Sequence, residues 1–337
     1  MNNKSKEGEN IPAKSNSVIA KRYFNVLSQI KEEMGKVVIG QDDVVELLLR
    51  ALLCDGHVLL EGVPGIAKTL IIRALGEASG CSTKRIQFTI DLLPTDILGL
   101  TSYSKEKGFE FIKGPIFANF VIADEINRAP PKTQSALLEA MQERQATIGT
   151  KTYPLPSPFF VMANQNPIET AGVNPLPEAQ VDRFLFKGYV GYPKTDEEQK
   201  IMKDNITLKK FEDFKLVPRT NSKEIIKMQD FIKKMYMSKD IERYIVKITR
   251  ITREKLKEFP LLRYVEYGAS PRAAIGMFIG SKAEALLQGS SYVTPQHVKK
   301  IAHDVLRHRI ILNYEGQSEN IKTDDIITEI LSKVAVP

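Results

Sequence analysis

Residues 62 to 69 read GVPGIAKT, and they follow the apolar run HVLLE at residues 57 to 61. The stretch matches the phosphate-binding pattern G-x-x-x-x-G-K-[ST] except at Ala67, which stands where the second glycine belongs. In such a loop, backbone N–H groups surround the phosphates, a lysine reaches the β and γ phosphates, and a hydroxyl coordinates Mg²⁺. Lys68 and Thr69 supply the last two groups, between an apolar strand and the start of a helix.

Ala67 leaves three interpretations open: a working loop, a decayed one, or a chance match. Ala67 still donates its N–H, so only its backbone angle and the room for one methyl group are in question. Right-handed helical angles would cost nothing, and a positive φ would cost roughly 1 to 2 kcal/mol, which a multidentate phosphate site can absorb. We predict that Ala67 has either a negative φ or visible backbone strain, with Gly65 carrying any left-handed turn that the loop requires.

A second motif lies about sixty residues further on. Residues 120 to 125, FVIADE, read as an apolar strand that ends in two carboxylates. Asp124 can hold Mg²⁺, and Glu125 can orient and deprotonate an attacking water. The alternative is an acidic pair that merely caps a strand. Together the two motifs predict a Mg²⁺-dependent nucleoside triphosphatase.

Short apolar runs alternate with helical segments through the first part of the chain. Unbroken apolar strands between helices are typical of a parallel sheet that is covered on both faces. We therefore predict a doubly wound α/β domain of five strands at His57–Glu61, Arg85–Ile90, Asn119–Ala123, Pro158–Ala163 and Phe184–Val190.

The rest of the chain is divided by composition. We expect a disordered polar tail at 1–17, two helices before the first strand at 21–53, and a helix after the loop at 68–79. Two insertions should project from the sheet, one at about 101–115 and a hairpin at about 144–158, and a small helical domain should follow at 195–337. The core domain is thus 18–194. In the helical domain, Gly289 ends one helix, and the expected N-caps are Ser222, Asp240, Ser270 and Thr294.

The chain has 337 residues, 42% of them hydrophobic, and a net charge of +7. The charge is +1 over residues 1–194 and +6 over 195–337, but the basic residues are scattered among acidic ones, which favours a solvated surface over a nucleic-acid site. No membrane-length apolar run or signal peptide is present, and Cys54 and Cys81 read as packing residues. We expect a cytoplasmic protein.

The motifs and the helical second domain resemble the AAA+ ATPases. More narrowly, the sequence is similar to the MoxR family over about residues 20 to 335, through the stretches GVPGIAKT, ADEINRAPPKTQSALLEAMQE, NQNPIE and LPEAQVDRF. Ala at the position of Ala67 is usual in that family. The resemblance implies an AAA+ P-loop core, a small all-α lid, and ATP with Mg²⁺ as cofactors.

The resemblance also implies a role for individual residues. Asn166 matches sensor 1, although Asn164 lies near and is the alternative. Arg183 matches the arginine finger, which would reach the nucleotide of a neighbouring subunit, where the alternative is a surface ion pair. The turn VIGQ, with Gly40 and Gln41, resembles the segment that packs against adenine, where the alternative is a plain turn between two helices. The remaining nucleotide contacts would come from Gly62, Val63, Pro64, Gly65, Ile66, Ala67, Lys68, Thr69 and Leu70, with Thr69 and Asp124 on the metal.

Arg272 in the stretch SPRA matches sensor 2. It lies in the first turn of the helix that Ser270 caps, where a cation is unfavourable by roughly 0.3 to 1 kcal/mol. A local rule broken without visible compensation points to function, and a phosphate would supply that compensation. The sequence leaves open whether this phosphate belongs to the same subunit.

The family resemblance further implies a hexameric ring that acts as a chaperone-like remodeller of a client protein, with a von Willebrand factor A domain protein as partner. The two insertions would then face the pore or the partner. The alternatives are a motor on nucleic acid, the ATPase subunit of a metal chelatase, and a scaffold that binds ATP and hardly hydrolyses it. The intact Lys68, Asp124, Glu125 and Arg183 argue against the last.

Overall fold

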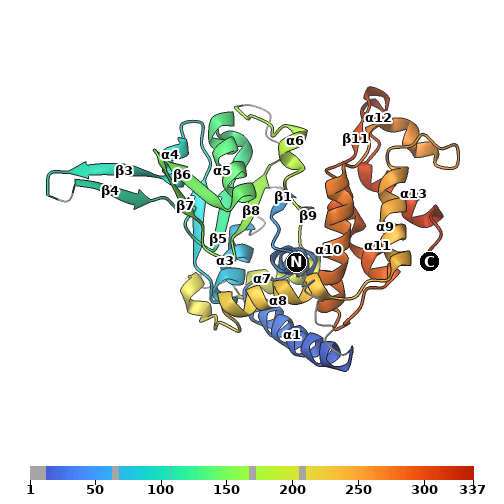
Figure 1. Ribbon diagram of the computed structural model, residues 1–337, viewed down its shortest axis with the longest axis horizontal. Coiled ribbons are helices and arrows are strands. Elements are labelled where there is room, and N and C mark those ends of the chain that lie inside the picture. The colour runs from blue at the N-terminus through green and yellow to red at the C-terminus, as the bar shows by residue number, and fades with distance from the viewer. Residues whose placement is uncertain (1–12, 63–67, 107, 167–171, 205–209) are drawn as a thin grey trace, which may run out of the picture.

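The computed structural model describes residues 13–62, 68–106, 108–166, 172–204 and 210–337. Its centre is a five-stranded parallel sheet, as expected, and the strands follow one another in the order β2-β5-β8-β1-β9 (Figure 1). The second strand lies at Thr83–Gln87, earlier than the predicted Arg85–Ile90. The strands are β1 (Val58–Gly62), β2 (Thr83–Gln87), β5 (Phe120–Asp124), β8 (Phe160–Gln165) and β9 (Phe186–Val190).

Both faces of the sheet are buried, because alternate side chains of each central strand enter different cores. In β5, for example, Phe120 and Ile122 belong to one core, and Val121 and Ala123 belong to the other. The first core contains α1 (Ala13–Met34), α2 (Asp42–Leu53) and α3 (Lys68–Ala78), and the second contains α4 (Pro94–Leu98) and α5 (Pro131–Glu143). The α/β fold with helices on both faces is therefore confirmed.

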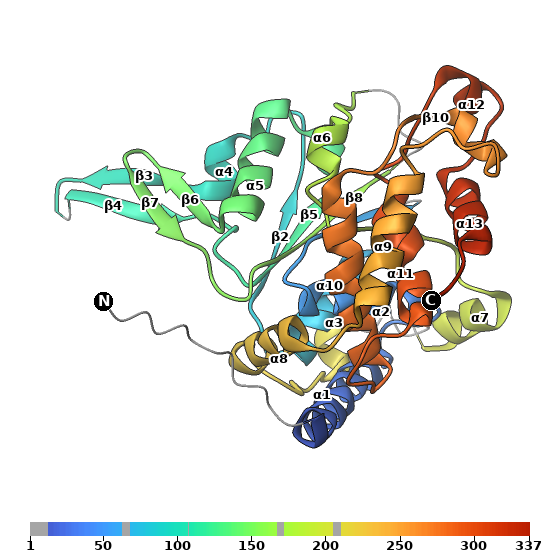
Figure 2. The same ribbon diagram turned by 45° about the vertical axis from the view of Figure 1, so that its right-hand side comes forward.

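The two predicted insertions are both β-hairpins that point away from the C-terminal helices (Figures 1 and 2). The longer hairpin joins β3 (Gly99–Ser104) to β4 (Gly108–Lys113), and the shorter one joins β6 (Gln145–Ile148) to β7 (Lys151–Pro154). Gly99 has φ of +102°, and a Cβ there would lie 2.2 Å from the carbonyl oxygen of Ile112. The longer hairpin therefore requires glycine at its base.

The C-terminal region is almost entirely helical. It begins with α7 (Thr195–Asp204), after the short α6 (Glu178–Val181) of the core, and continues as α8 (Ser222–Lys234), α9 (Lys239–Ile251), α10 (Pro271–Leu287), α11 (Pro295–Leu306), α12 (Tyr314–Ser318) and α13 (Thr323–Lys333). One detail differs from the all-α expectation: β10 (Val265–Tyr267) and β11 (Ile311–Leu312) pair as a small antiparallel ribbon. Three 3₁₀ turns complete the described elements: Ile126–Arg128, Phe211–Phe214 and Pro260–Tyr264.

Two of the four expected N-caps are displaced. The N-cap of α8 is Asn221, not Ser222, and its side chain accepts from the Glu224 N–H. The N-cap of α9 is Ser238, not Asp240, which lies in the first turn, where its charge favours the helix dipole. The predictions for Ser270, Thr294 and the helix end at Gly289, which has φ of +73°, are confirmed.

The expected tail of residues 1–17 is too long, because α1 already begins at Ala13, and residues 1–12 lie outside the described part of the chain. Near the other end of α1, Glu33 is 1% exposed and joins this helix to the segment after residue 214. Burial raises the pKa of the Glu33 carboxyl, but hydrogen bonds from Lys36, the Val217 N–H and Arg219 outweigh it and lower the pKa to about 2.

Candidate nucleotide site

The predicted phosphate and metal residues meet at the carboxyl edge of the sheet. Strands β1, β5 and β8 run parallel, with Leu60 opposite Asn164 and Ala123 opposite Ala163, so their last residues lie side by side. Helix α3 begins at Lys68, directly after the loop that follows β1. Residues Val63, Pro64, Gly65, Ile66 and Ala67 lie outside the described part of the chain, and so does the prediction for the φ of Ala67.

Lys68 and Thr69 open α3 with their side chains turned toward the strand ends. Lys68 Nζ donates to the Gly62 carbonyl oxygen at 2.6 Å, and Thr69 Oγ1 donates to Asp124 Oδ2 at 3.3 Å. The lysine is therefore at the loop, and the hydroxyl is beside the carboxylate. One hydroxyl and one carboxylate oxygen at this separation fit the ligands that Mg²⁺ takes in nucleotide sites.

Asp124 is 9% exposed and is surrounded by hydrogen-bond donors. Its Oδ2 also accepts from Arg85 Nε at 2.9 Å and forms an ion pair with the same guanidinium, and its Oδ1 accepts from the side-chain amide of Asn164. Arg85 is on β2, where Gln87 is opposite Asp124. The sequence motifs contain no sign of this arginine.

Glu125 ends the strand in a left-handed conformation, with φ of 56° and ψ of 50°. Its N–H donates to Asn164 Oδ1 at 2.9 Å. Its carboxylate accepts from Gln87 Nε2 at 2.8 Å and lies 3.2 Å from Arg128 Nε. Gln87 and Arg128 therefore both hold the Glu125 carboxylate in this structure.

The two candidates for sensor 1 lie at the end of β8: Asn164 belongs to the strand, and Asn166 directly follows it. Asn164 is 2% exposed and bridges Asp124 and Glu125, as described above. Asn166, the residue that we favour from the sequence, is 7% exposed and is the last described residue before the gap at 167–171. Asn164 thus organises the acidic pair, and the choice of Asn166 as sensor 1 stays a prediction.

The expected adenine segment lines a small cavity beside β9. Gly40 has φ of +72°, and Gln41 Nε2 donates to the Gly191 carbonyl oxygen at 3.0 Å. The cavity has a volume of about 280 Å³ and is also lined by Tyr189 and Tyr192. These tyrosines are not in the sequence prediction, because only the pairing of β9 with β1 brings them beside Gln41.

Arg183 lies at the opposite edge of the sheet. It precedes β9, whose first residue Phe186 is opposite Val58 at the start of β1, whereas Gly62 at the loop is opposite Val190. The span of β9 is about 13 Å at roughly 3.3 Å per residue. Arg183 therefore lies toward the end of the sheet that is away from the loop of its own chain.

Arg272 lies beside Arg183, and both line one cavity of about 330 Å³. The expectation that nothing compensates Arg272 at its helix N-terminus is wrong, because its Nη1 lies 3.5 Å from Asp182 Oδ2. That partner is ninety residues away in the sequence. The side chain of Arg272 is still 51% exposed, so it also remains accessible from solvent.

Comparison with known proteins agrees with this geometry. The chain is 44% identical over 309 residues to Chaperone MoxR1 of Mycobacterium tuberculosis, covering 90% of this chain and 81% of the relative. The chain belongs to the MoxR family of AAA+ ATPases. This MoxR-family chain is also 43% identical to YeaC of Bacillus subtilis, over 93% of this chain and 95% of the relative.

The fold of this MoxR-family chain also has a relative of known structure. A crystal structure from Cytophaga hutchinsonii, described as that of a candidate ATPase, is 43% identical with a TM-score of 0.88, covering 96% of this chain and 98% of the other. The family model for the ATPase family associated with various cellular activities (AAA) matches residues 57–186, and that for the AAA lid domain matches residues 263–330. These ranges fall on either side of residue 195, and the boundary at that residue stays a prediction.

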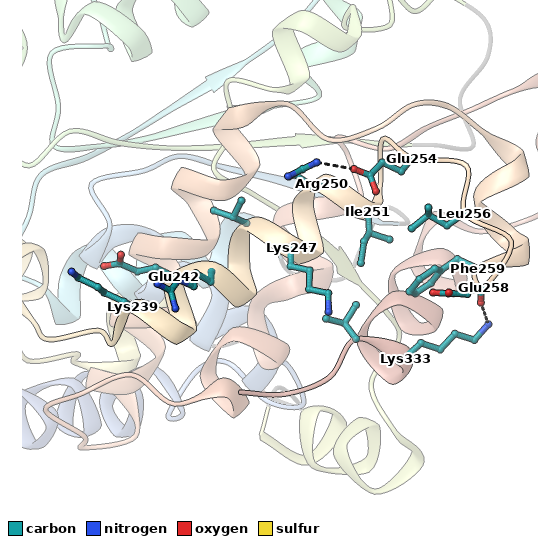
Figure 3. A pocket seen from close by; sticks show the side chains of 13 residues that line it. Lys239, Glu242, Lys247, Arg250, Ile251, Glu254, Leu256, Glu258, Phe259 and Lys333 are labelled. Carbon is teal, nitrogen blue, oxygen red and sulfur yellow. Dashed lines mark hydrogen bonds and ion pairs between the residues drawn. The ribbon is translucent and has the colours of Figure 1, made fainter.

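A larger cavity of this MoxR-family chain lies elsewhere. It has a volume of about 620 Å³ and lies on the C-terminal helical region, between α9 and the end of α13 (Figure 3). Its walls carry both signs of charge, such as the pair of Arg250 and Glu254, and no motif residue lines it. Size alone therefore does not locate the nucleotide site.

Among the described helices, none is long and apolar enough to cross a membrane.

Proposed function

We propose that the chain binds ATP with Mg²⁺ and hydrolyses it to ADP and phosphate as a subunit of an oligomeric ring. The observation that carries the proposal is the meeting of Lys68, Thr69, Asp124 and Glu125 at one edge of the sheet. Family membership adds the nucleotide and its hydrolysis as an expectation.

Each residue has a distinct task in this proposal. Lys68 binds the β and γ phosphates, and Thr69 and Asp124 would hold Mg²⁺, which neutralises charge on the phosphates when bound. Glu125 takes a proton from the attacking water. Asn166 positions that water, and the cavity beside Gly40 and Gln41 takes the adenine.

The arginines complete the site of a neighbouring subunit. Arg183 and Arg272 share a cavity at the edge of the sheet that is opposite to the loop, so they face outward from their own nucleotide. We propose that both act in trans, on the phosphates held by the next subunit of a hexameric ring. The specific activity should then rise with protein concentration as the subunits assemble, and an activity independent of concentration would argue against this arrangement.

The biological task that we propose is the chaperone-like remodelling of a client protein, in concert with a von Willebrand factor A domain partner. The name of the relative Chaperone MoxR1 supports the chaperone role. The two hairpins offer surfaces for the client or the partner, and the longer one, β3–β4, extends well beyond the core (Figure 1).

The substitution Glu125→Gln tests the proposed reaction. The variant keeps Asp124 and Thr69 for the metal, so it should bind ATP as the native chain does, and hydrolysis should fall by about 10² to 10⁴-fold because the base is lost. Glu139→Gln, an exposed position on α5, is the matched control and should hydrolyse ATP normally. Normal turnover by Glu125→Gln would overturn the assignment.

A further inference from the structure

Arg309 is a buried arginine whose five N–H groups all have acceptors. Its side chain is 3% exposed, so a guanidinium there needs a full set of partners. Nε donates to Asp182 Oδ1 at 2.7 Å, and Nη2 donates to the carbonyl oxygens of Asp182 and Phe184 at 3.2 and 2.7 Å. Nη1 donates to the carbonyl oxygens of Leu185 at 3.1 Å and of Val305. Three of these acceptors are backbone carbonyls on either side of Arg183.

Asp182 receives two more groups from the same region of the chain. Ser270 Oγ donates to its Oδ2 at 3.1 Å, and Arg272 Nη1 lies 3.5 Å from the same oxygen. Ser270 and Arg272 belong to the start of α10, and Arg309 follows α11. Three side chains from the C-terminal helices therefore meet on the residue that directly precedes Arg183.

The side chain of Arg183 itself is held much less tightly. Arg183 is exposed, and within the described ranges its side chain makes one long hydrogen bond, from Nη1 to the Leu138 carbonyl oxygen at 3.3 Å. The backbone is thus fixed by Arg309 and Asp182, while the guanidinium stays available to an external acceptor. A group that stabilises transferred phosphate works only when it is held to within about 0.5 Å of its productive place.

We propose that Asp182 and Arg309 are positioning residues for Arg183, so that the C-terminal helices set the place of the arginine finger that a subunit offers to its neighbour. This inference rests on the proposed trans role of Arg183. It also makes Arg309 irreplaceable by lysine, since an ammonium has three donors and cannot bind the carbonyls of residues 182, 184 and 185 while also pairing with the carboxylate.

The test mixes subunits so that one kind supplies only the finger. Recipient subunits carry Arg183→Ala and keep their own nucleotide site, and donor subunits carry Lys68→Ala and keep Arg183. Mixing the two should restore ATP hydrolysis at recipient sites. Adding Asp182→Asn to the donor should lower the restored rate by about 10²-fold, the cost of a misplacement near 1 Å. Co-purification through a tag on the donor measures assembly.

Two further variants of the donor subunit separate a positioning effect from a general loss of stability. Ser270→Ala removes only the hydroxyl from Asp182, so it should fold well and give a smaller loss in the same direction. Asp304→Asn is the matched control: Asp304, on α11, pairs with Arg50 of the core at 2.9 Å and with Arg307 at 3.1 Å. Among the described residues, it forms no hydrogen bond or ion pair with residues 182–185. This control donor should restore hydrolysis fully.

Each outcome has one meaning. If the Lys68→Ala donor restores nothing, the trans role of Arg183 is wrong, and the present inference falls with it. If that donor works and the donor with Asp182→Asn works equally well, only the positioning role is overturned. An equal loss with Asp304→Asn would also overturn it, because the effect would then come from general loosening of the contact between core and C-terminal helices.

Discussion

Replacing Arg85 with alanine is expected to strengthen the binding of Mg²⁺ at Asp124. In the structure, the Arg85 guanidinium takes the same carboxylate oxygen that the Thr69 hydroxyl contacts. A metal ion that binds Thr69 and Asp124 must therefore compete with this arginine. Removing the competitor leaves the carboxylate free for the metal.

The size of the effect follows from the exposure of the pair. The side chain of Arg85 is 52% exposed and that of Asp124 is 12% exposed, so solvent screens much of the attraction. An exposed ion pair contributes at most about 1 kcal/mol, which corresponds to roughly fivefold in the half-saturating Mg²⁺ concentration.

The measurement is a Mg²⁺ titration of nucleotide binding, followed with a fluorescent ATP analogue. The chain contains no tryptophan, which keeps the intrinsic signal low. Lys84→Ala is the matched control, because Lys84 is the preceding residue of β2, is exposed, and points to the other face of the strand. Equal shifts for Arg85→Ala and Lys84→Ala would show a general effect of charge, and weaker Mg²⁺ binding by Arg85→Ala would refute the reasoning.

Three further predictions concern stability and the sensor. The Glu33 carboxylate stabilises the fold above its ordinary pKa of 4.5, and this contribution is lost as the pH falls toward 2; the melting temperatures of the native chain and Glu33→Gln should therefore differ at pH 7 and converge in acid. Gly99→Ala should lower the free energy of unfolding in urea by more than Gly149→Ala. Both glycines have a positive φ, but an added Cβ would lie 2.2 Å from the Ile112 carbonyl oxygen at Gly99 and would meet no atom within 4 Å at Gly149. Asn166→Ala should lower turnover at an unchanged melting temperature, whereas Asn164→Ala should lower both, as measured by ATP hydrolysis and thermal unfolding of each variant.

The central strands β1, β5 and β8 could be predicted from the sequence because each of them is a local apolar run. The same is true of the pair Asp124 and Glu125, which directly follow such a run, and of Lys68 at the start of a helix. In these places the signal and the structure that it specifies lie within a few residues of each other. The projecting insertions were also visible, since they interrupt the alternation of strand and helix.

What the sequence could not show depends on contacts between distant segments. Arg85 reads as an ordinary surface residue until β2 pairs with β5. The tyrosines at 189 and 192 join Gln41 only because β9 lies beside β1. Asp182 compensates Arg272 across the junction of two regions. None of these pairings can be seen in the sequence alone. From the sequence, only a phosphate is therefore expected to compensate the charge of Arg272.

The loop and the arginines lie at opposite ends of the sheet, and this placement bears on how much ATP unassembled subunits would consume. On the proposed function, a lone subunit contains both halves of a catalytic centre but cannot bring them together, because Gly62 and Arg183 lie toward opposite ends of the β1–β9 pair. On the proposed function, an open row of n subunits has n − 1 complete centres, and a closed circle has n. Unassembled subunits would therefore spare the ATP pool, and the last subunit to enter would complete two centres at once.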